Sequence, residues 1–284
     1  RALIKHLAAA GFQDDDAIAA GLARRPDDGR APYAFFRNRL MFPVADRRGR
    51  VVAFGARLLE GEGPKYINSP DTELFHKGQL LYGLSRARQS VGHGHPVIVA
   101  EGYMDVIALV RAGFRGAVAP LGTALTEAQI AELWRMAPVP VLCFDGDEAG
   151  KRAAYRAVER VLPGLRPDHS VAVAFLPSGE DPDSLIRIRG AEAFRTVLEA
   201  ARPLAQVLWD RAVDGRRLDT PEAKAGLQAA LEATAGQIGD GSVREYYRRD
   251  FRQRLDEAFP WRPVGRGRND RGRGGMGRGA FRPA

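Results

Sequence analysis

The chain has 284 residues, of which 45% are hydrophobic and 27% charged, with a formal net charge of +8 and a pI near 10.0. These values are typical of a globular protein with one large or two to three small domains, and the basic balance is compatible with a nucleic acid or an anionic membrane surface as partner. A single cysteine, Cys143, excludes an internal disulfide framework and a cysteine-rich zinc site, and no apolar run approaches the roughly 18 residues of a membrane-spanning helix.

The amino-terminal segments predict a mixed structure. Residues 1–30 carry apolar residues at helical spacing and predict a helical segment. Residues 41–54 predict a β-hairpin, with two apolar strands joined by a charged turn that contains Gly49. Residues 64–70 lie between two prolines and predict an irregular loop.

From about residue 96 the pattern becomes α/β. Short apolar runs rich in β-branched residues alternate with stretches of helical spacing, which indicates a parallel sheet covered by helices on both faces. The predicted strands are 97–100, 117–119, 139–144 and 171–176, and the predicted helices are 106–111, 127–136, 149–162 and 191–200.

The carboxy-terminal part divides in two. Residues 201–262 predict helices, whereas residues 263–284 are rich in glycine and arginine and predict disorder. That tail holds six arginines and one aspartate, so it carries +5 of the net charge and leaves the remainder at about +3.

Acidic residues follow three of the predicted strands. Because the carboxyl ends of parallel strands lie along one edge of a sheet, these carboxylates are expected to converge. Oxygen ligands without histidine or cysteine favour Mg²⁺ or Mn²⁺, and Mg²⁺ sites work with substrate phosphates. The alternative is that these acids only cap the next helix, with Asp147 and Asp183 as the best candidates. The acids are Glu101, Asp105, Asp145, Asp147, Glu180, Asp181 and Asp183.

These acids carry a resemblance to a known family. Glu101-Gly-Tyr-Met-Asp105 and Asp145-Gly-Asp147-Glu-Ala-Gly150 resemble the Toprim fold of primases, topoisomerases and some nucleases. The chain is most similar to the catalytic core of bacterial DnaG-type primases, well over residues 1–190 and loosely over 191–262. Further segments that resemble that core, in order, are 39–43, 49–57, 64–70, 75–78, 81–83 and 179–183.

The resemblance implies a fold, a reaction and roles for single residues. The fold is α/β, a Toprim-type parallel sheet flanked by helices, preceded by a mixed α+β subdomain and followed by a helical subdomain. Glu101 resembles the family's catalytic glutamate, and Asp145 and Asp147 its principal Mg²⁺ ligands. Supporting metal ligands are Asp105, Asp181 and Asp183. The implied reaction joins the 3′ oxygen of one nucleotide to the α-phosphate of the next ribonucleoside triphosphate, with Mg²⁺ as cofactor and Mn²⁺ as a substitute.

The resemblance also implies a basic face for the template strand and nucleotide phosphates. Sequence-independent contacts of this kind are typical of lysine and arginine. The residues of this face are Arg37, Arg39, Arg57, Lys65, Asn68 and Lys77. Tyr66 is either a base-stacking residue or a packed loop tyrosine, and Arg47, Arg48 and Arg50 are expected to be solvated turn residues.

The implied partners are single-stranded DNA, ribonucleoside triphosphates, the RNA primer and a replicative helicase, with no membrane. The family's amino-terminal zinc ribbon, which holds the only zinc expected, and its carboxy-terminal helicase-binding domain are expected to lie outside this chain, as is the start of the catalytic core, since the sequence begins at Arg1. The expected location is the bacterial cytoplasm, at the replication fork of the nucleoid.

The expected division has four parts: 1–90 for the basic amino-terminal part of the core, 91–190 for the Toprim domain, 191–262 for a helical subdomain and 263–284 for a linker. Two other functions stay open. One is another Toprim enzyme, either a nuclease or a topoisomerase, whose nucleophile would be Tyr246 or Tyr247. The other is a nucleic-acid-binding module without catalysis.

Overall fold

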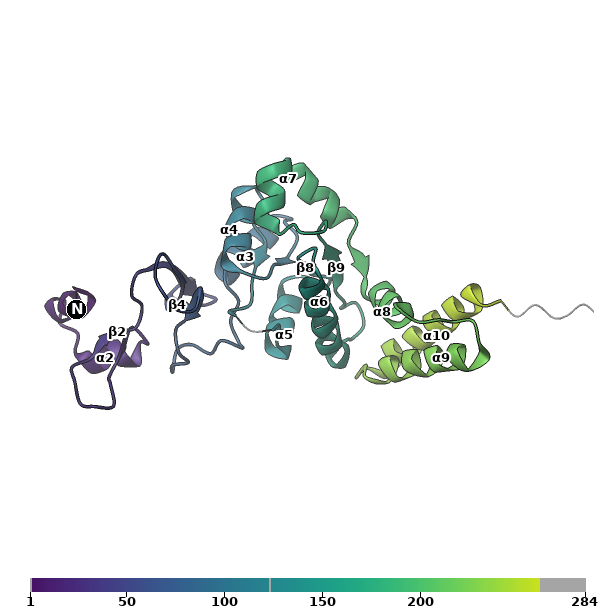
Figure 1. Cartoon of the computed structure of the whole chain (residues 1–284), viewed down its shortest axis with the longest axis horizontal. Helices are drawn as coiled ribbons and strands as arrows, with labels where there is room; N and C mark the ends of the chain where they lie inside the picture. The colour runs from purple at the N-terminus through teal and green to yellow at the C-terminus, as the bar shows by residue number, and fades with distance from the viewer. Residues whose placement is uncertain (1, 123, 261–284) are drawn as a thin grey trace, which may run out of the picture.

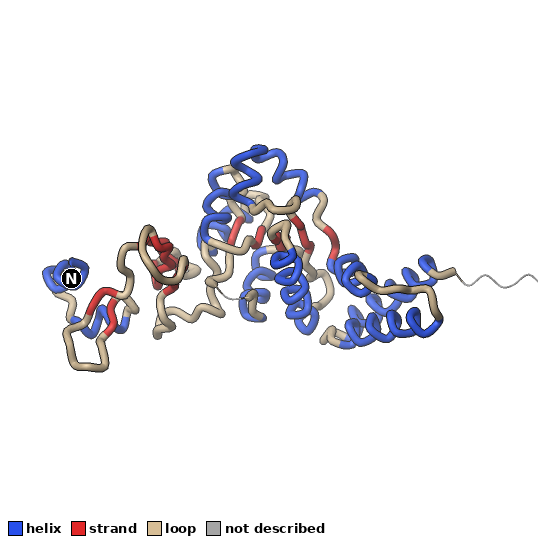
Figure 2. Tube along the Cα trace, in the orientation of Figure 1, coloured by secondary structure: helices blue, strands red, loops and turns tan. Residues whose placement is uncertain are grey.

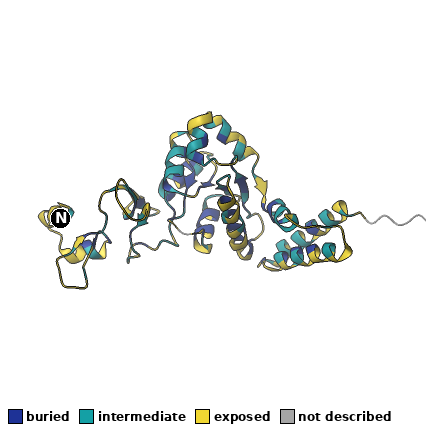
Figure 3. Ribbon diagram, in the orientation of Figure 1, coloured by how far each residue is buried: buried dark blue, intermediate teal, exposed yellow. Residues whose placement is uncertain are grey.

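The computed structural model describes residues 2–122 and 124–260. Three parts follow one another along the long axis of the molecule (Figure 1). A small amino-terminal part precedes a central sheet covered by helices, and a group of helices follows. Residues coloured as buried concentrate in the central part (Figure 3). The expected disorder of 263–284 lies outside the described residues.

The first segment contains less helix than its spacing predicts. Helices α1 (Ala2–Ala9) and α2 (Asp14–Ala19) are followed by a two-stranded antiparallel sheet of β1 (Ala23–Arg24) and β2 (Tyr33–Ala34). The prediction of one helical segment over 1–30 is therefore wrong beyond Ala19. Gly21 adopts a φ of 69°, which turns the chain out of the helix, and a Cβ there would lie 3.1 Å from the Pro70 ring.

The predicted hairpin is confirmed and gains a third strand. Strands β3 (Arg39–Ala45) and β4 (Val51–Leu58) pair antiparallel, and Gly49 in their turn has a φ of 84°. Strand β5 (Tyr66–Asn68) pairs with β4. The prediction that residues 64–70 form an irregular loop is therefore partly wrong. Three residues between two prolines give no period-2 pattern, and pairing with β4 determines their conformation.

After α3 (Leu84–Val91) the chain enters a five-stranded sheet in the order β10-β9-β8-β6-β7. Four strands are parallel, as predicted, and β10 at one edge is antiparallel to β9. Figure 2 shows these strands enclosed by helices. Their bounds are Ile98–Val99 for β6, Ala117–Val118 for β7, Val141–Phe144 for β8, Ala172–Phe175 for β9 and Arg202–Pro203 for β10.

Helices cover both faces of this sheet (Figure 1). Helices α4 (Tyr103–Arg111) and α7 (Pro182–Glu199) pack against each other on one face. Helices α5 (Glu127–Met136) and α6 (Glu148–Val161), the latter continued by a short 3₁₀ turn, η1 (Leu162–Gly164), lie on the other face. Alternate residues of each of the four parallel strands enter two separate apolar clusters, which explains the near-continuous apolar runs in the sequence.

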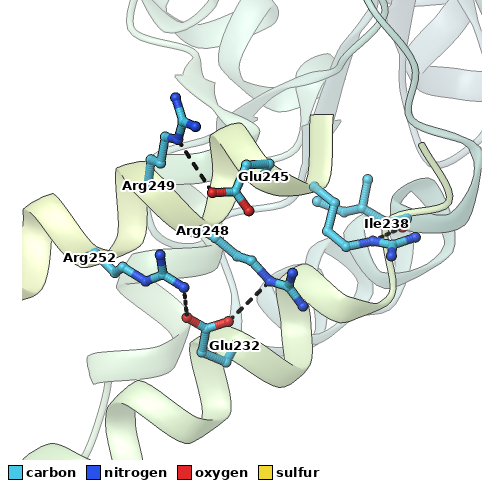
Figure 4. A network of polar contacts seen from close by, with 7 residues as sticks. Glu232, Ile238, Glu245, Arg248, Arg249 and Arg252 are labelled. Carbon is cyan, nitrogen blue, oxygen red and sulfur yellow. Dashed lines mark hydrogen bonds and ion pairs between the residues drawn. The ribbon is translucent and has the colours of Figure 1, made fainter. Parts of the chain in front are cut away.

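The last described part consists of α8 (Leu204–Val213), α9 (Pro221–Gly236) and α10 (Gly241–Ala258). Leu208 of α8, Leu231 of α9 and Phe251 of α10 belong to the same buried cluster as one face of the sheet. On the surface, Glu232 of α9 binds Arg248 and Arg252 of α10 at 3.2 and 3.1 Å (Figure 4).

The expected boundary at residue 190 coincides with a kink in α7 at Gly190. Among the helices that the structure describes, none has the length and apolar character needed to cross a membrane.

Candidate active site

The strand order creates a crevice at the carboxyl edge of the sheet. Strands β6 and β8 are neighbours, but β6 continues through α4 to β7 on one side and β8 continues through α6 to β9 on the other. Where neighbouring strands lead away in opposite directions, the chain leaves open the space beyond their carboxyl ends. Glu101 follows β6 and Asp145 follows β8, so both acids lie at this crevice.

Backbone hydrogen bonds hold the first acids in place. The Asp145 amide donates to Glu101 Oε1 at 3.2 Å, which joins the ends of the two neighbouring strands. Asp105 lies in the first turn of α4, and its Oδ2 accepts from the Gly102 amide at 3.0 Å. Asp105 is therefore turned back toward the end of β6.

Close backbone packing brings the acids after β9 to the same edge. The Gly146 amide donates to the Glu180 carbonyl at 3.1 Å. A Cβ on Gly146 would lie 1.8 Å from the Pro177 carbonyl oxygen, so only glycine allows the loops after β8 and β9 to approach this closely. The third acidic segment thereby lies beside the second.

Two of the acids also cap helices. Asp147 Oδ1 accepts from the Gly150 amide at 2.7 Å and caps α6, as expected. Asp181 Oδ1 accepts from the Ser184 amide at 2.6 Å and caps α7. The expectation that Asp183 is a cap is wrong, because Pro182 occupies the first helical position and places Asp183 inside the first turn.

Burial and the charges of neighbouring acids raise the pKa values of Asp105 and Asp145. Burial is the largest cause of a pKa of about 7 for Asp105, followed by the charge of Asp181, while the bond from Gly102 opposes the shift. Burial also raises the pKa of Asp145 to about 7, followed by the charges of Glu101 and Asp105. Carboxyls that resist ionisation at neutral pH form a site that a cation would stabilise.

The donor chemistry suits a hard divalent cation. Asp145 Oδ1 is buried and accepts no hydrogen bond from the part of the chain that the structure describes. A buried carboxylate oxygen without a donor is costly unless a cation approaches it. Within residues 2–122 and 124–260, however, no three acidic, histidine or cysteine side chains already converge to enclose an ion. Oxygen ligands that leave room for water are typical of Mg²⁺ and Mn²⁺.

Most residues of the predicted basic face surround the β4–β5 pair. Arg57 and Lys65 each lie 5.9 Å from the ring centre of Tyr66, of which 39% is exposed. Arg39 donates to the Pro64 carbonyl at 2.9 Å. Arg37 lies apart from them, 5.1 Å over the ring of Tyr33 beside β2.

Asn68 and Lys77 lie where the amino-terminal part meets the central sheet. The Asn68 amide group donates to the Leu121 carbonyl at 2.9 Å and accepts from the Tyr103 hydroxyl. The amide nitrogen and the amide oxygen of Asn68 are therefore both hydrogen-bonded within the protein. Lys77 Nζ makes no hydrogen bond or ion pair within the described residues, and the Lys77 carbonyl accepts from Gln129 at 3.1 Å.

One buried acid, Glu132, was not predicted from the sequence. Glu132 of α5 is only 2% exposed and binds Arg47, which was expected to be a solvated turn residue. Glu132 and the fully buried Gln129 lie on one side of α5, three residues apart. The only sequence signal for this burial was the spacing of the two polar residues beside apolar Ile130 and Leu133. Such a signal is weak, because residues three apart share a helix face whether that face is buried or exposed.

Three family descriptions match successive segments of the chain. Residues 1–88 match the amino-terminal domain of the DNA primase catalytic core, residues 95–175 match the Toprim domain, and residues 205–256 match the DnaB-helicase binding domain of primase. The DNA primase of Pseudomonas aeruginosa is 45% identical over 256 residues, which make up 90% of this chain and 38% of that protein. The chain thus spans about two fifths of such a relative.

Solved structures agree with this similarity. A DNA primase domain from Pseudomonas aeruginosa has 44% sequence identity and a TM-score of 0.81, with 88% of this chain and 78% of that one covered. The catalytic domain of a DnaG primase bound to single-stranded DNA has 40% identity and a TM-score of 0.78, with 88% and 80% covered.

Proposed function

The chain belongs to the DnaG-type DNA primase family, and we propose that it synthesises short RNA primers on single-stranded DNA by divalent-metal-dependent nucleotidyl transfer. The observation that carries this proposal is the acidic edge of the sheet, where Asp145 has a raised pKa and a buried oxygen without a donor among the described residues. Such an edge suits phosphoryl chemistry, in which charge on phosphate oxygens must be neutralised.

The acids divide into two groups by their surroundings. Asp145 and Asp105 are the proposed direct ligands, because burial makes their charged forms dependent on a cation. Asp147 and Asp181 keep one oxygen on a helix amide, so each has its second oxygen available. Asp183 completes the supporting set.

Glu101 has a separate proposed role. Its carboxylate is exposed and is held by the Asp145 amide, so it is accessible to a substrate hydroxyl. We assign it to metal binding or to acceptance of the proton from the attacking 3′ oxygen. Bound Mg²⁺, or Mn²⁺ in its place, would neutralise the phosphate oxygens and lower the pKa of that hydroxyl.

The basic side chains around Tyr66 supply the proposed nucleic-acid contacts. Arg57 and Lys65 hold cationic groups near a half-exposed aromatic ring, which is the combination that binds a phosphate and stacks a base. Arg37, Arg39 and Lys77 extend this proposed contact to the template and to the ribonucleoside triphosphate. For Asn68 we propose that it acts by orienting Tyr103 and the loop at Leu121.

A replicative helicase is the proposed protein partner. The match to the helicase-binding description covers residues 205–256, which form α8, α9 and α10. The sequence expectation placed this contact in a domain outside the chain. The match supports a contact that includes the helical part of this chain as well.

The similarity also supports the proposed division into a basic part (1–90), a Toprim part (91–190) and a helical part (191–262), since the three matched segments are 1–88, 95–175 and 205–256.

A topoisomerase is disfavoured by the positions of its candidate nucleophiles. Tyr247 packs against Phe251 at 5.8 Å, and Tyr246 is exposed on α10, in the helical part rather than at the acidic edge.

The test is RNA synthesis on single-stranded DNA with labelled ribonucleotides and Mg²⁺ or Mn²⁺. We expect short RNA products from the parent chain and none from Asp145→Asn. Binding of Mn²⁺, measured by titration, should be retained by the parent and weakened in the variant. A parent chain that binds no Mn²⁺ and makes no RNA would identify a binding module without catalysis.

A further inference from the structure

One buried carboxylate joins two parts of the molecule. Glu132 lies in α5 of the central part and is 2% exposed. It binds Arg47, which lies in the turn between β3 and β4 of the amino-terminal part. It also binds Arg135 of its own helix at 2.8 Å. A buried carboxylate needs a cationic partner, so Glu132 is a specific attachment point for the hairpin turn.

A second attachment lies in the middle of the same hairpin. Gly55 of β4 lies against the ring of Tyr103 at the start of α4, and a Cβ at this position would be 2.3 Å from the ring carbon Cζ. The Tyr103 hydroxyl binds Asn68, which β5 holds opposite Gly55. Tyr103 lies only two residues after Glu101 in the sequence, so this attachment adjoins a residue of the acidic edge.

The two attachments lie at the turn and in the middle of the hairpin, whereas its cationic residues lie near the other end. Arg57 follows Gly55 by two residues, or about 7 Å along an extended strand, and Lys65 and Tyr66 lie beside it. Arg47 lies beyond the other end of β4. The middle of the hairpin is held by Gly55 and by the buried apolar cluster that Phe42, Val44 and Ala53 form with Tyr103 and Leu121. The Arg47–Glu132 contact adds a polar attachment at the turn, so the hairpin is held at two places along its length.

We propose that Arg47 and Glu132 are positioning residues that fix the angle of the β3–β4 hairpin, and with it the distance from Arg57 and Lys65 to the acidic edge. The reaction proposed above needs both groups at once, because phosphates held by the hairpin must reach the metal ligands. Misplacement by about 1 Å can lower a rate about 100-fold. The catalytic part of this inference rests on the proposed function, and the geometric part does not.

The charges around Glu132 allow a variant that folds. When Arg47 is replaced by alanine, Arg135 still compensates the buried carboxylate. The ion pair between the two parts is then lost, while the contacts at Gly55 and the charge pair within α5 remain. Arg48 is a matched control, because it is an exposed arginine of the same turn whose one hydrogen bond within residues 2–122 and 124–260 runs from its amide to Asp46 Oδ1.

The test is the distance between two spin labels, on Leu59→Cys beyond β4 and Ile188→Cys in α7. These side chains are 60% and 61% exposed, whereas the native Cys143 is 2% exposed and should stay unlabelled. We expect one narrow distance distribution for the parent and for Arg48→Ala, and a broader or shifted one for Arg47→Ala. Arg47→Lys should largely restore the narrow distribution. Identical distributions for Arg47→Ala and Arg48→Ala would overturn the proposal.

A second arm measures primer synthesis and DNA binding in the same variants. We expect Arg47→Ala to lower kcat by about tenfold or more, with the Kd for single-stranded DNA changed less than twofold, since every proposed DNA contact remains. Adding Glu132→Ala to Arg47→Ala should cause little further loss of kcat, because the contact between the two parts is already removed and the Arg135 pair lies within α5. A fall in DNA affinity equal to the fall in kcat would contradict positioning. A parent that makes no RNA and binds no Mn²⁺ would refute the proposed function, and the label distances would still decide whether Arg47 fixes the hairpin.

Discussion

Asp145 is the residue at which folding and the proposed chemistry conflict most clearly. An isolated aspartate has a pKa of 3.8, whereas burial and neighbouring acids raise that of Asp145 to about 7. Between these values the folded protein binds more protons than the unfolded chain, so its metal-free stability falls as pH rises. A cation that binds the charged form should reverse this loss above neutral pH.

We therefore predict opposite effects of Asp145→Asn with and without metal. At pH 8 without metal, the variant should be as stable as the parent or more stable by about 1 kcal/mol, because an unfavourable charge is removed from a partly exposed site. The increase in Tm on adding Mn²⁺ should be much smaller than for the parent. Thermal unfolding with and without Mn²⁺ measures both, with Asp219→Asn, an exposed aspartate of the helical part, as control. A metal-free variant that is clearly less stable would assign Asp145 a structural role.

Gly146 is predicted to be indispensable for steric reasons. A Cβ at this position would lie 1.8 Å from the Pro177 carbonyl oxygen and 2.4 Å from its carbon, which are backbone atoms that move little. Gly146→Ala should destabilise the fold by about 1–3 kcal/mol or more, as overpacking does. Gly236→Ala is the matched control, because a Cβ there has nothing within 4 Å and helix propensity favours alanine. Chemical denaturation compares the two, and equal stability would show that the loops after β8 and β9 separate readily.

At the scale of elements, the strands that could be predicted from the sequence are those buried on both faces of the sheet. Strands β8 and β9 were predicted because Leu142, Cys143, Val173 and Ala174 form unbroken apolar runs. Strand β10 was missed, since Arg202 and Pro203 are exposed and pair only through their backbones with the edge of the sheet. The acids were predicted to meet because topology alone brings strand ends together. The Arg47–Glu132 contact depends on the docking of two parts, which no local pattern records.

The start of α7 allows capping to be separated from metal binding. Asp181 caps the helix, whereas Asp183 lies within its first turn. Asp181→Ala should cost about 1 kcal/mol of stability and also lower activity. Asp181→Asn should keep the cap and the stability but lower activity, since asparagine caps as well as aspartate but carries no charge. Asp183→Ala should cost less than Asp181→Ala, because it loses only a helix-dipole interaction. Denaturation and primer synthesis on all three variants check this, and full activity of Asp181→Asn would remove Asp181 from the proposed ligand set.

At the scale of the molecule, cationic and acidic groups are carried by different parts. Arg57 and Lys65 belong to the small β3–β4–β5 sheet, Lys77 belongs to the segment that leads to α3, and the acids belong to the central sheet. This division predicts that affinity for DNA and chemistry can be changed independently. Substitutions of the acids should spare binding, and substitutions of the lysines should weaken it.

Lys65→Ala and Lys77→Ala should each weaken binding of single-stranded DNA and reduce its dependence on salt. Each phosphate contact on a single strand contributes about 0.7 to the slope of log K against log salt, so each variant should lower the slope by about that amount. Arg217→Ala, at an exposed arginine between α8 and α9, should leave both affinity and slope unchanged. Titrations of a fluorescent oligonucleotide at several salt concentrations give these slopes. If both lysine variants keep the parent slope, the template does not lie on the surface around Tyr66. If Arg217→Ala lowers the slope as well, DNA extends over the helical part, and the two-part division of binding and chemistry would need a third contact.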